Sequence, residues 1–131
     1  MMSLERMLNK AQTNYEMVRD WLYIKQRGDS LVDYFLEDNY KSIAIYGGGD
    51  LGQLLLQELE ESAIKVEVIF DNNAKEIYLE GKVEKYIPHQ ISAQCLVITA
   101  VFDIARIIEL IRNNNPEIPI VSLREIISTL C

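Results

Sequence analysis

The chain has 131 residues, of which 49% are hydrophobic and 25% charged, and these proportions fit one globular domain with an apolar core. Its net charge of -7 at pH 7 argues against nucleic acid as a partner, because nucleic-acid phosphates would repel such a surface. Its longest apolar run is far shorter than the roughly 20 residues that span a bilayer, and the N-terminus lacks a signal-peptide core, so we expect a cytoplasmic protein without membrane insertion.

The first predicted element is a helix over about residues 3–26, ended by Gly28. One apolar stripe runs along it with spacings of 4, 3, 4, 3 and 4 residues: Leu4, Leu8, Ala11, Tyr15, Val18 and Leu22. Further apolar residues widen this face, namely Met7, Met17, Trp21 and Ile24. Such a face is wider than one small domain covers, so we expect part of it to make a homo-oligomer. The alternative is that the whole face packs against its own domain.

A second short helix is predicted after Asp29, with Ser30 and Asp33 at capping-box spacing and Asn39 near its end. The two helices form an N-terminal helical extension over residues 1–40. The hydrophobic period changes at Ser42, which places the second part of the chain at residues 41–131.

Short apolar runs alternate with helical patterns in this second part. Strands are predicted at 43–46, 66–70, 96–99 and 118–122, with a weaker one around Val83. Helices are predicted from 51 to about 62, from 104 to 111 with Asp103 as cap, and after Ser122, which forms a capping box with Glu125. Strands that are apolar on both faces predict a parallel sheet of about five strands covered by helices on both sides.

Three glycines follow the first of these strands and open the next helix. Gly47, Gly49 and Gly52 spell GxGxxG in the context that this motif requires. The first glycine permits a tight turn, the second lets backbone amides approach a pyrophosphate, and the third lets helix and strand pack closely. This predicts a Rossmann-like three-layer fold, with a candidate binding loop made of Gly47, Gly48, Gly49, Asp50, Leu51 and Gly52.

An acidic residue belongs about 20 positions beyond the glycines, where it accepts hydrogen bonds from a ribose. Asp71 follows the second predicted strand at that spacing. No Arg comes directly after it, since Asn72 and Asn73 do, which favours NAD over NADP. Asp50 argues against binding, because its carboxylate could cap the helix amides that a pyrophosphate would use. In the alternative reading, the glycines only shape a turn.

The third long strand ends at Thr99 and Ala100, small residues placed where open α/β sheets bind ligands, and these complete the candidate cofactor site. No catalytic set is predicted. Tyr78 and Lys82 spell YxxxK, but Gly81 between them disfavours the helix on which that pair acts in short-chain dehydrogenases. His89 is the only histidine, so no metal triad is expected.

The two cysteines have neither a metal spacing nor a disulfide framework. Cys95 lies in an apolar strand and Cys131 at the terminus, so both are interpreted as structural thiols that suit a reducing cytoplasm.

From residue 21 to residue 127 the chain resembles NAD(P)-binding Rossmann-like domains found with bacterial surface-polysaccharide enzymes, including modules associated with sugar-nucleotide dehydratases and epimerases. The stretches that carry the resemblance are WLYIKQRGDSLVDYFLEDNYKSIAIYGGGDLG, VEVIFDNNA, LVITAVFD and IPIVSLREII. The resemblance implies a nucleotide or sugar-nucleotide site at the glycine loop and Asp71, and no catalytic residues.

Three functions remain open. The first is an accessory module that binds NAD or a UDP-sugar in polysaccharide synthesis, without catalysis of its own and with an enzyme of that pathway as possible partner. The second is a degenerate Rossmann scaffold that docks or oligomerises through its first helix and binds no ligand. The third is an oxidoreductase or epimerase subunit completed by a partner chain.

Overall fold

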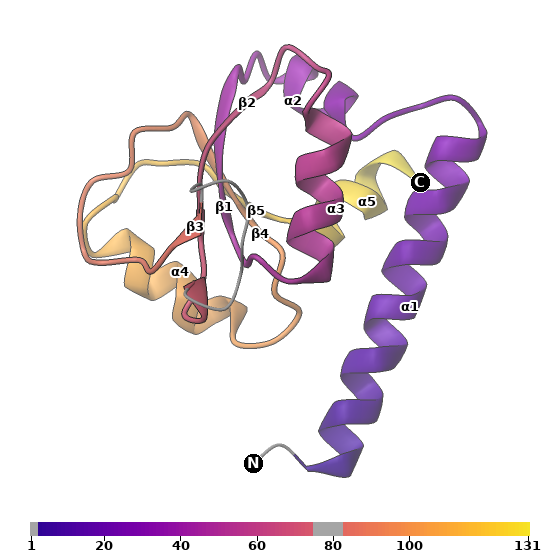
Figure 1. The fold of residues 1–131 in the computed structure, drawn as a ribbon, viewed down its shortest axis with the longest axis horizontal. Coiled ribbons are helices and arrows are strands. Elements are labelled where there is room, and N and C mark those ends of the chain that lie inside the picture. The colour runs from indigo at the N-terminus through magenta and orange to yellow at the C-terminus, as the bar shows by residue number, and fades with distance from the viewer. Residues whose placement is uncertain (1–2, 75–82) are drawn as a thin grey trace.

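The structure is a computed structural model that describes residues 3–74 and 83–131. Its helices are α1 (Leu4–Gln26), α2 (Val32–Glu37), α3 (Asp50–Leu59), α4 (Ile104–Arg112) and α5 (Leu123–Leu130). Its strands are β1 (Ser42–Tyr46), β2 (Lys65–Phe70), β3 (Val83–Glu84), β4 (Cys95–Ile98) and β5 (Ile120–Ser122). Figure 1 shows α1 as a long rod beside the sheet, with its N-terminal end extending beyond the rest of the molecule.

The five strands form one parallel sheet in the order β3-β2-β1-β4-β5. This is the order of the first five strands of a dinucleotide-binding Rossmann fold, so the predicted Rossmann-like architecture is confirmed. The connections from β1 and from β4 leave in opposite directions along the sheet. The carboxyl ends of β1 and β4 therefore meet at the point where ligands bind in sheets of this kind.

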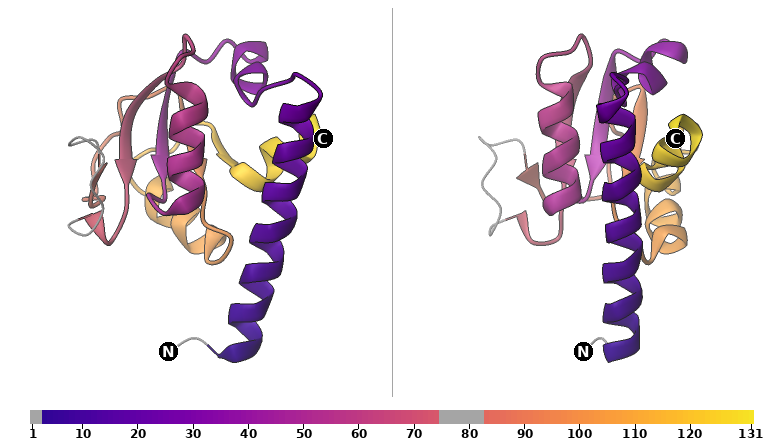
Figure 2. Two further views of the ribbon diagram at one scale, coloured as in Figure 1. Left: turned by 45° about the vertical axis from the view of Figure 1, so that its right-hand side comes forward. Right: turned by 90° about the vertical axis from the view of Figure 1, so that its right-hand side faces the viewer.

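Helices cover both faces of the sheet (Figure 2). Alternate residues of β1 point to the two sides, since Ile43 and Ile45 belong to one buried cluster while Ala44 and Tyr46 belong to the other. The first cluster contains apolar side chains of α1, α3 and α5, and the second contains those of α4. The three layers predicted from the strand pattern follow directly from this alternation.

Helix α1 begins at the N-cap Ser3, whose hydroxyl accepts a hydrogen bond from the Arg6 amide, and ends before Gly28, which has a φ of +89°. Its buried residues are Met17, Trp21 and Ile24. The stripe at 4, 3, 4, 3, 4 spacing instead faces outward, with exposed fractions from 42% to 71% at Leu4, Leu8, Tyr15, Val18 and Leu22. The alternative that the whole apolar face packs against its own domain is therefore wrong.

Within the described residues, no helix combines the length and apolarity needed to cross a membrane.

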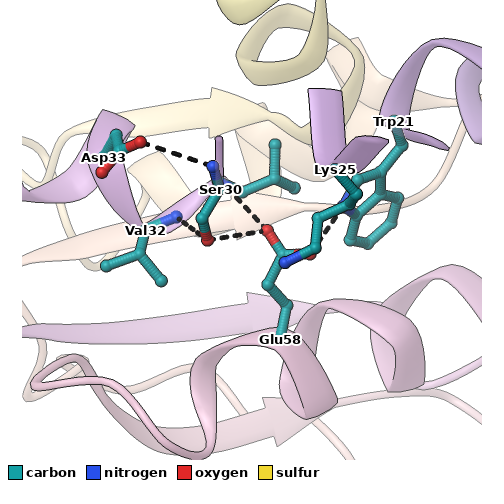
Figure 3. A network of polar contacts seen from close by, with 7 residues as sticks. Trp21, Lys25, Ser30, Val32, Asp33 and Glu58 are labelled. Carbon is teal, nitrogen blue, oxygen red and sulfur yellow. Dashed lines mark hydrogen bonds and ion pairs between the residues drawn. The ribbon is translucent and has the colours of Figure 1, made fainter. Parts of the chain in front are cut away.

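A buried carboxylate on α3 attaches the N-terminal helices to the sheet layers (Figure 3). The Glu58 side chain is only 7% exposed, and its Oε1 accepts from Trp21 Nε1 at 2.9 Å and lies 3.3 Å from Lys25 Nζ. Its Oε2 accepts from Ser30 Oγ at 3.1 Å and from the Leu31 amide at 2.6 Å. One side chain thus fixes the end of α1, the connection and the start of α2.

The predicted N-cap residues of the helices do not all make the hydrogen bonds expected of them. At Ser122 the N-cap half of the predicted box is observed, since its hydroxyl accepts from the Glu125 amide at 3.1 Å. At α2 the Asp33 carboxylate accepts from the Ser30 amide, but the N-cap is Leu31. Asp103 occupies the N-cap position of α4 without a side-chain capping bond, because its φ of +60° turns it away and its carboxylate pairs with Arg6.

Asn115 is a buried polar residue just beyond the end of α4. Its Oδ1 accepts from the Ile91 amide at 2.6 Å, and its Nδ2 donates to the His89 carbonyl at 2.9 Å. It thereby holds the loop between β3 and β4 against the end of α4.

Candidate functional site

The glycine loop lies at the carboxyl edge of the sheet, between β1 and α3, as the motif predicts. Gly47 has a φ of +121°, a conformation that a side chain disfavours, and a Cβ there would lie 2.1 Å from Thr99 Oγ1. A Cβ on Gly52 would lie 1.9 Å from the Gly47 carbonyl oxygen. Both glycines are therefore required by the fold itself, the first for the turn and the second for close packing of α3.

Gly49 differs from both of these glycines. Its φ is -75°, which any residue adopts, and a Cβ built on it meets no atom within 4 Å. Neither packing nor backbone strain therefore requires a glycine here, and the fold's own use of it is as the N-cap of α3, a position that Ser, Thr, Asn and Asp also fill. The residue lines a cavity, so the space that a side chain would fill is space available to a ligand that approaches the backbone.

The first amides of α3 are available to such a ligand. Within the described residues, the amides of Asp50, Leu51 and Gly52 make no hydrogen bond, and the first amide of this stretch to find a carbonyl is that of Gln53, which bonds Gly49. The side chain of Asp50 is exposed, and within the described residues it makes no hydrogen bond to these amides, although its carboxylate stands in the first turn of α3. The helix start offers unpaired N–H groups to an anion.

Asp71 lies at the end of β2 and contacts the loop directly. Its Oδ2 accepts from the Gly48 amide at 2.7 Å, and its Oδ1 accepts from the Asn73 amide at 2.8 Å. The carboxylate therefore fixes the loop from the neighbouring strand. Each oxygen retains a further lone pair, and Asp71 borders the cavity, so it can still accept hydrogen bonds from a ribose.

Thr99 and Ala100 also border this cavity. Ala100 only lines it, whereas the side chain of Thr99 is engaged within the protein. The buried Thr99 hydroxyl lies 3.0 Å from the Gly47 carbonyl oxygen and 3.2 Å from that of Tyr46, to which it can donate. Gln53 Nε2 donates to the Gly48 carbonyl at 3.1 Å. Thr99 is thus a residue that positions the loop rather than one with a hydroxyl free for ligand.

The structure brings the predicted residues, except the buried Gly48, together around a cavity of about 400 Å³ and adds a wall that sequence reasoning missed. That wall is the N-terminal half of α1, which contributes Arg6, Lys10 and Asn14. These residues are four apart, so they form a polar row on one face of the helix. The row was a readable signal, but nothing in the sequence showed that this helix face lies over the glycine loop.

The side chains of this wall are polar, and one of them is already paired with other residues of the protein. Arg6 pairs with Asp103 at 3.5 Å, and its guanidinium lies 4.9 Å from the centre of the Phe102 ring. Lys10 has no ion pair within the described residues. Asn14 Oδ1 is inaccessible to solvent and has no hydrogen-bond partner there. The cavity wall therefore supplies one unengaged cation close to the loop.

Within the described residues, the other residues considered for catalysis or metal binding do not line this cavity. His89 is exposed and bonds through its ring to the Ile87 carbonyl, as a surface-loop histidine. Burial raises the pKa of the Cys95 thiol to about 12, which suits a packing role. Tyr78 and Lys82 lie outside the described residues. In the part of the chain that the structure describes, no group of three or more potential ligands is arranged to hold a metal.

Comparison of the chain with protein-family models, with curated proteins and with solved structures gave no match.

Proposed function

We propose that this protein is a nucleotide-binding module that takes NAD at the glycine loop and performs no catalysis on its own. The observation that carries the proposal is Gly49, a glycine that neither backbone strain nor packing requires, facing the cavity next to three unpaired amides. A pyrophosphate is the group that such a loop accommodates, because it needs close approach to backbone N–H groups.

The charges around the cavity favour NAD over a UDP-sugar. Its lining holds two cations, Arg6 and Lys10, and three carboxylates, Asp50, Asp71 and Asp103, a balance of 2 - 3 = -1. NAD carries one net negative charge, because its nicotinamide cation offsets one phosphate, whereas a UDP-sugar carries two. The less anionic ligand meets less repulsion at a site with this balance.

The proposal is tested with a pair of glycine variants. Gly49→Val should fold with its unfolding free energy lowered by about 1 kcal/mol, the usual difference between glycine and valine at a helix N-cap, since the Cβ it adds has no protein atom within 4 Å, and it should lose NAD binding. Gly52→Ala should instead lose about 1–3 kcal/mol of stability, because its Cβ would collide with the Gly47 carbonyl. Binding is measured by calorimetry and stability by urea unfolding.

A thermal-shift series with NAD, NADH, UDP-glucose and CoA identifies the ligand class. A ligand present at 100 times its Kd stabilises the folded state by about 2.7 kcal/mol, which moves the melting temperature of a domain of this size measurably. If none of these ligands shifts the transition, the nucleotide proposal fails. If Gly49→Val keeps full affinity, the ligand sits elsewhere.

The pathway is part of the proposal and has its support in the sequence resemblance alone. That resemblance favours service in sugar-nucleotide or surface-polysaccharide metabolism in the cytoplasm, with a UDP-sugar as the alternative ligand and an enzyme of that pathway as partner. The alternative of a subunit completed by a partner chain, as an oxidoreductase or epimerase, predicts that NAD binds without turnover until the partner is added.

A second candidate function is a docking or oligomerisation module that binds no ligand. The observation that favours it is the outward-facing apolar stripe on α1, which the fold of one chain leaves uncovered. Asp50 also favours it, because this carboxylate in the first turn of α3 borders the cavity and competes with an anion for the same end of the helix dipole. Ligand binding and self-association are compatible, since they use different faces of α1.

A further inference from the structure

Two apolar rows lie on different faces of α1, and only one of them is covered. Met17, Trp21 and Ile24 are buried against the domain. The outward row of Leu4, Leu8, Ala11, Tyr15, Val18 and Leu22 keeps alternating spacings of 4 and 3 over its whole length. This is the spacing of the seam of a two-helix coiled coil, in which a helix with the same repeat supplies the other half. A second copy of the chain provides such a helix.

The row is complementary to itself when the two helices run in opposite directions. The row is symmetric about Thr13, so Leu4 then faces the partner's Leu22, Leu8 faces the partner's Val18, and Ala11 faces the partner's Tyr15. The smallest residue of the row meets its only aromatic ring, which allows even packing along the seam. In a parallel pair each residue would instead meet its own copy, which places Tyr15 against the partner's Tyr15.

Charges beside the row favour the same direction. Glu5 and Arg19 lie on one flank of the row, and in an antiparallel pair Glu5 faces the partner's Arg19. In a parallel pair the flanking contacts would join Met7 to the partner's Gln12 and Asn14 to the partner's Arg19, with no opposite charges. Flanking charges of this kind set the orientation of paired helices.

The surroundings of the row differ at its two ends. Near its C-terminal end, Val18, Leu22 and the half-exposed Leu54 of α3 line a groove of about 370 Å³. At its N-terminal end α1 extends beyond the sheet layers (Figures 1 and 2), and Leu4 and Leu8 are widely exposed. Antiparallel pairing places the partner's Leu4 and the partner's Leu8 at this groove. A two-fold axis repeats this contact, so that the protruding end of each α1 helix occupies the groove of the other chain.

We propose that the protein forms a two-fold homodimer through antiparallel pairing of α1, with Leu4, Leu8 and Ala11 of each chain facing the partner's Leu22, Val18 and Tyr15. This pairing does not depend on nucleotide binding. At 3.6 residues per turn, this apolar row lies about 120° around the helix from Arg6, Lys10 and Asn14, so the cavity over the glycine loop stays outside the seam.

Cysteine crosslinking distinguishes the two directions in a Cys131→Ser background, where the remaining Cys95 is buried. In an antiparallel pair, Leu8 and the partner's Leu8 are about 15 Å apart along the axis at 1.5 Å per residue, too far for a disulfide. The double variant Leu8→Cys/Val18→Cys should therefore give a covalent dimer on mild oxidation, and neither single variant should. Efficient crosslinking of Leu8→Cys alone would show parallel helices and overturn the proposal.

Sedimentation equilibrium tests the dimer itself with the full chain. The unmodified protein should be dimeric at 100 µM, and Leu8→Glu should make it monomeric without lowering its helix content, because Leu8 is exposed. Leu36→Glu, at an exposed leucine of α2 away from the row, is the matched control and should leave the dimer intact. A strict monomer at 100 µM, or an equal effect of the two substitutions, would overturn the proposal, including the case in which a different protein covers the row.

Discussion

Lys10 is the residue whose role the sequence alone could least reveal. It borders the glycine-loop cavity and has no carboxylate partner within the described residues. Its ammonium group is therefore available to a phosphate, whereas Arg6 is already paired with Asp103. This difference makes Lys10 the sharper probe of charge recognition at the site.

Lys10→Met should lower the affinity for NAD about two- to fivefold at low salt, equivalent to about 0.3–1 kcal/mol for one exposed charge. Raising the ionic strength should reduce the difference between variant and parent, because salt screens exposed charges. Lys41→Met, at an exposed lysine just before β1 and outside the cavity, is the matched control in calorimetric titrations. Equal affinities for all three proteins would exclude Lys10 from the site.

The two thiols should react very differently with a disulfide reagent. Cys131 is exposed, whereas Cys95 is buried and its pKa is raised to about 12, so at pH 8 it is both inaccessible and protonated. One thiol per chain should react with DTNB within minutes under native conditions, and two after unfolding in guanidinium. Fast reaction of two native thiols would contradict the packing role of Cys95.

Single residues show where sequence reasoning stops. The bond from Asp71 to a ribose stays a prediction. The spacing from Gly52 placed this acid at the end of β2, beside β1, but it did not predict the bond that Asp71 accepts from the Gly48 amide. It could not distinguish Gly49 from Gly47 and Gly52, since the difference depends on what a Cβ would touch. Asp50 lies in the first turn of α3 as the sequence indicates, but its position in the sequence does not fix the rotamer on which capping depends.

At the scale of elements, Glu58 joins α3 to the ends of α1 and α2. Removing its carboxylate would leave Trp21 Nε1 and the Leu31 amide without acceptors in a largely buried place. Glu58→Ala should therefore lower the unfolding free energy by about 3 kcal/mol. Glu60→Ala, at an exposed position two residues on, should change it by less than about 0.5 kcal/mol. Urea unfolding compares them, and similar losses would mean that the network contributes little.

Element boundaries were predicted well where local signals act alone. The Ser122 cap, the Gly28 stop and the strand next to the glycines depend on neighbouring residues, and each was placed within two positions. The face that α1 buries was not predictable in this way. Both apolar rows satisfy helical spacing, and only the docking of the helix through Met17, Trp21 and Ile24 decides between them.

For the whole molecule, the strand order explains why the candidate site lies where it does. Since β1 and β4 are adjacent and their connections diverge, the loops that follow them leave a gap at the carboxyl edge. The N-terminal half of α1 closes one side of this gap with Arg6 and Lys10. The sequence predicted the sheet and the edge, but the closing wall comes from a segment more than 30 residues before the loop, whose docking no local pattern encodes.

The bond between Asp71 and the Gly48 amide has a consequence for the energetics of ligand capture. Together with the contacts from Thr99 and Gln53, it holds the glycine loop in one conformation before any ligand arrives. A ligand that docks on a loop already ordered does not bear the entropic cost of ordering it. We therefore expect ligands to bind this loop without a conformational change of the protein. Differences in affinity among ligands should then come mainly from their dissociation rate constants.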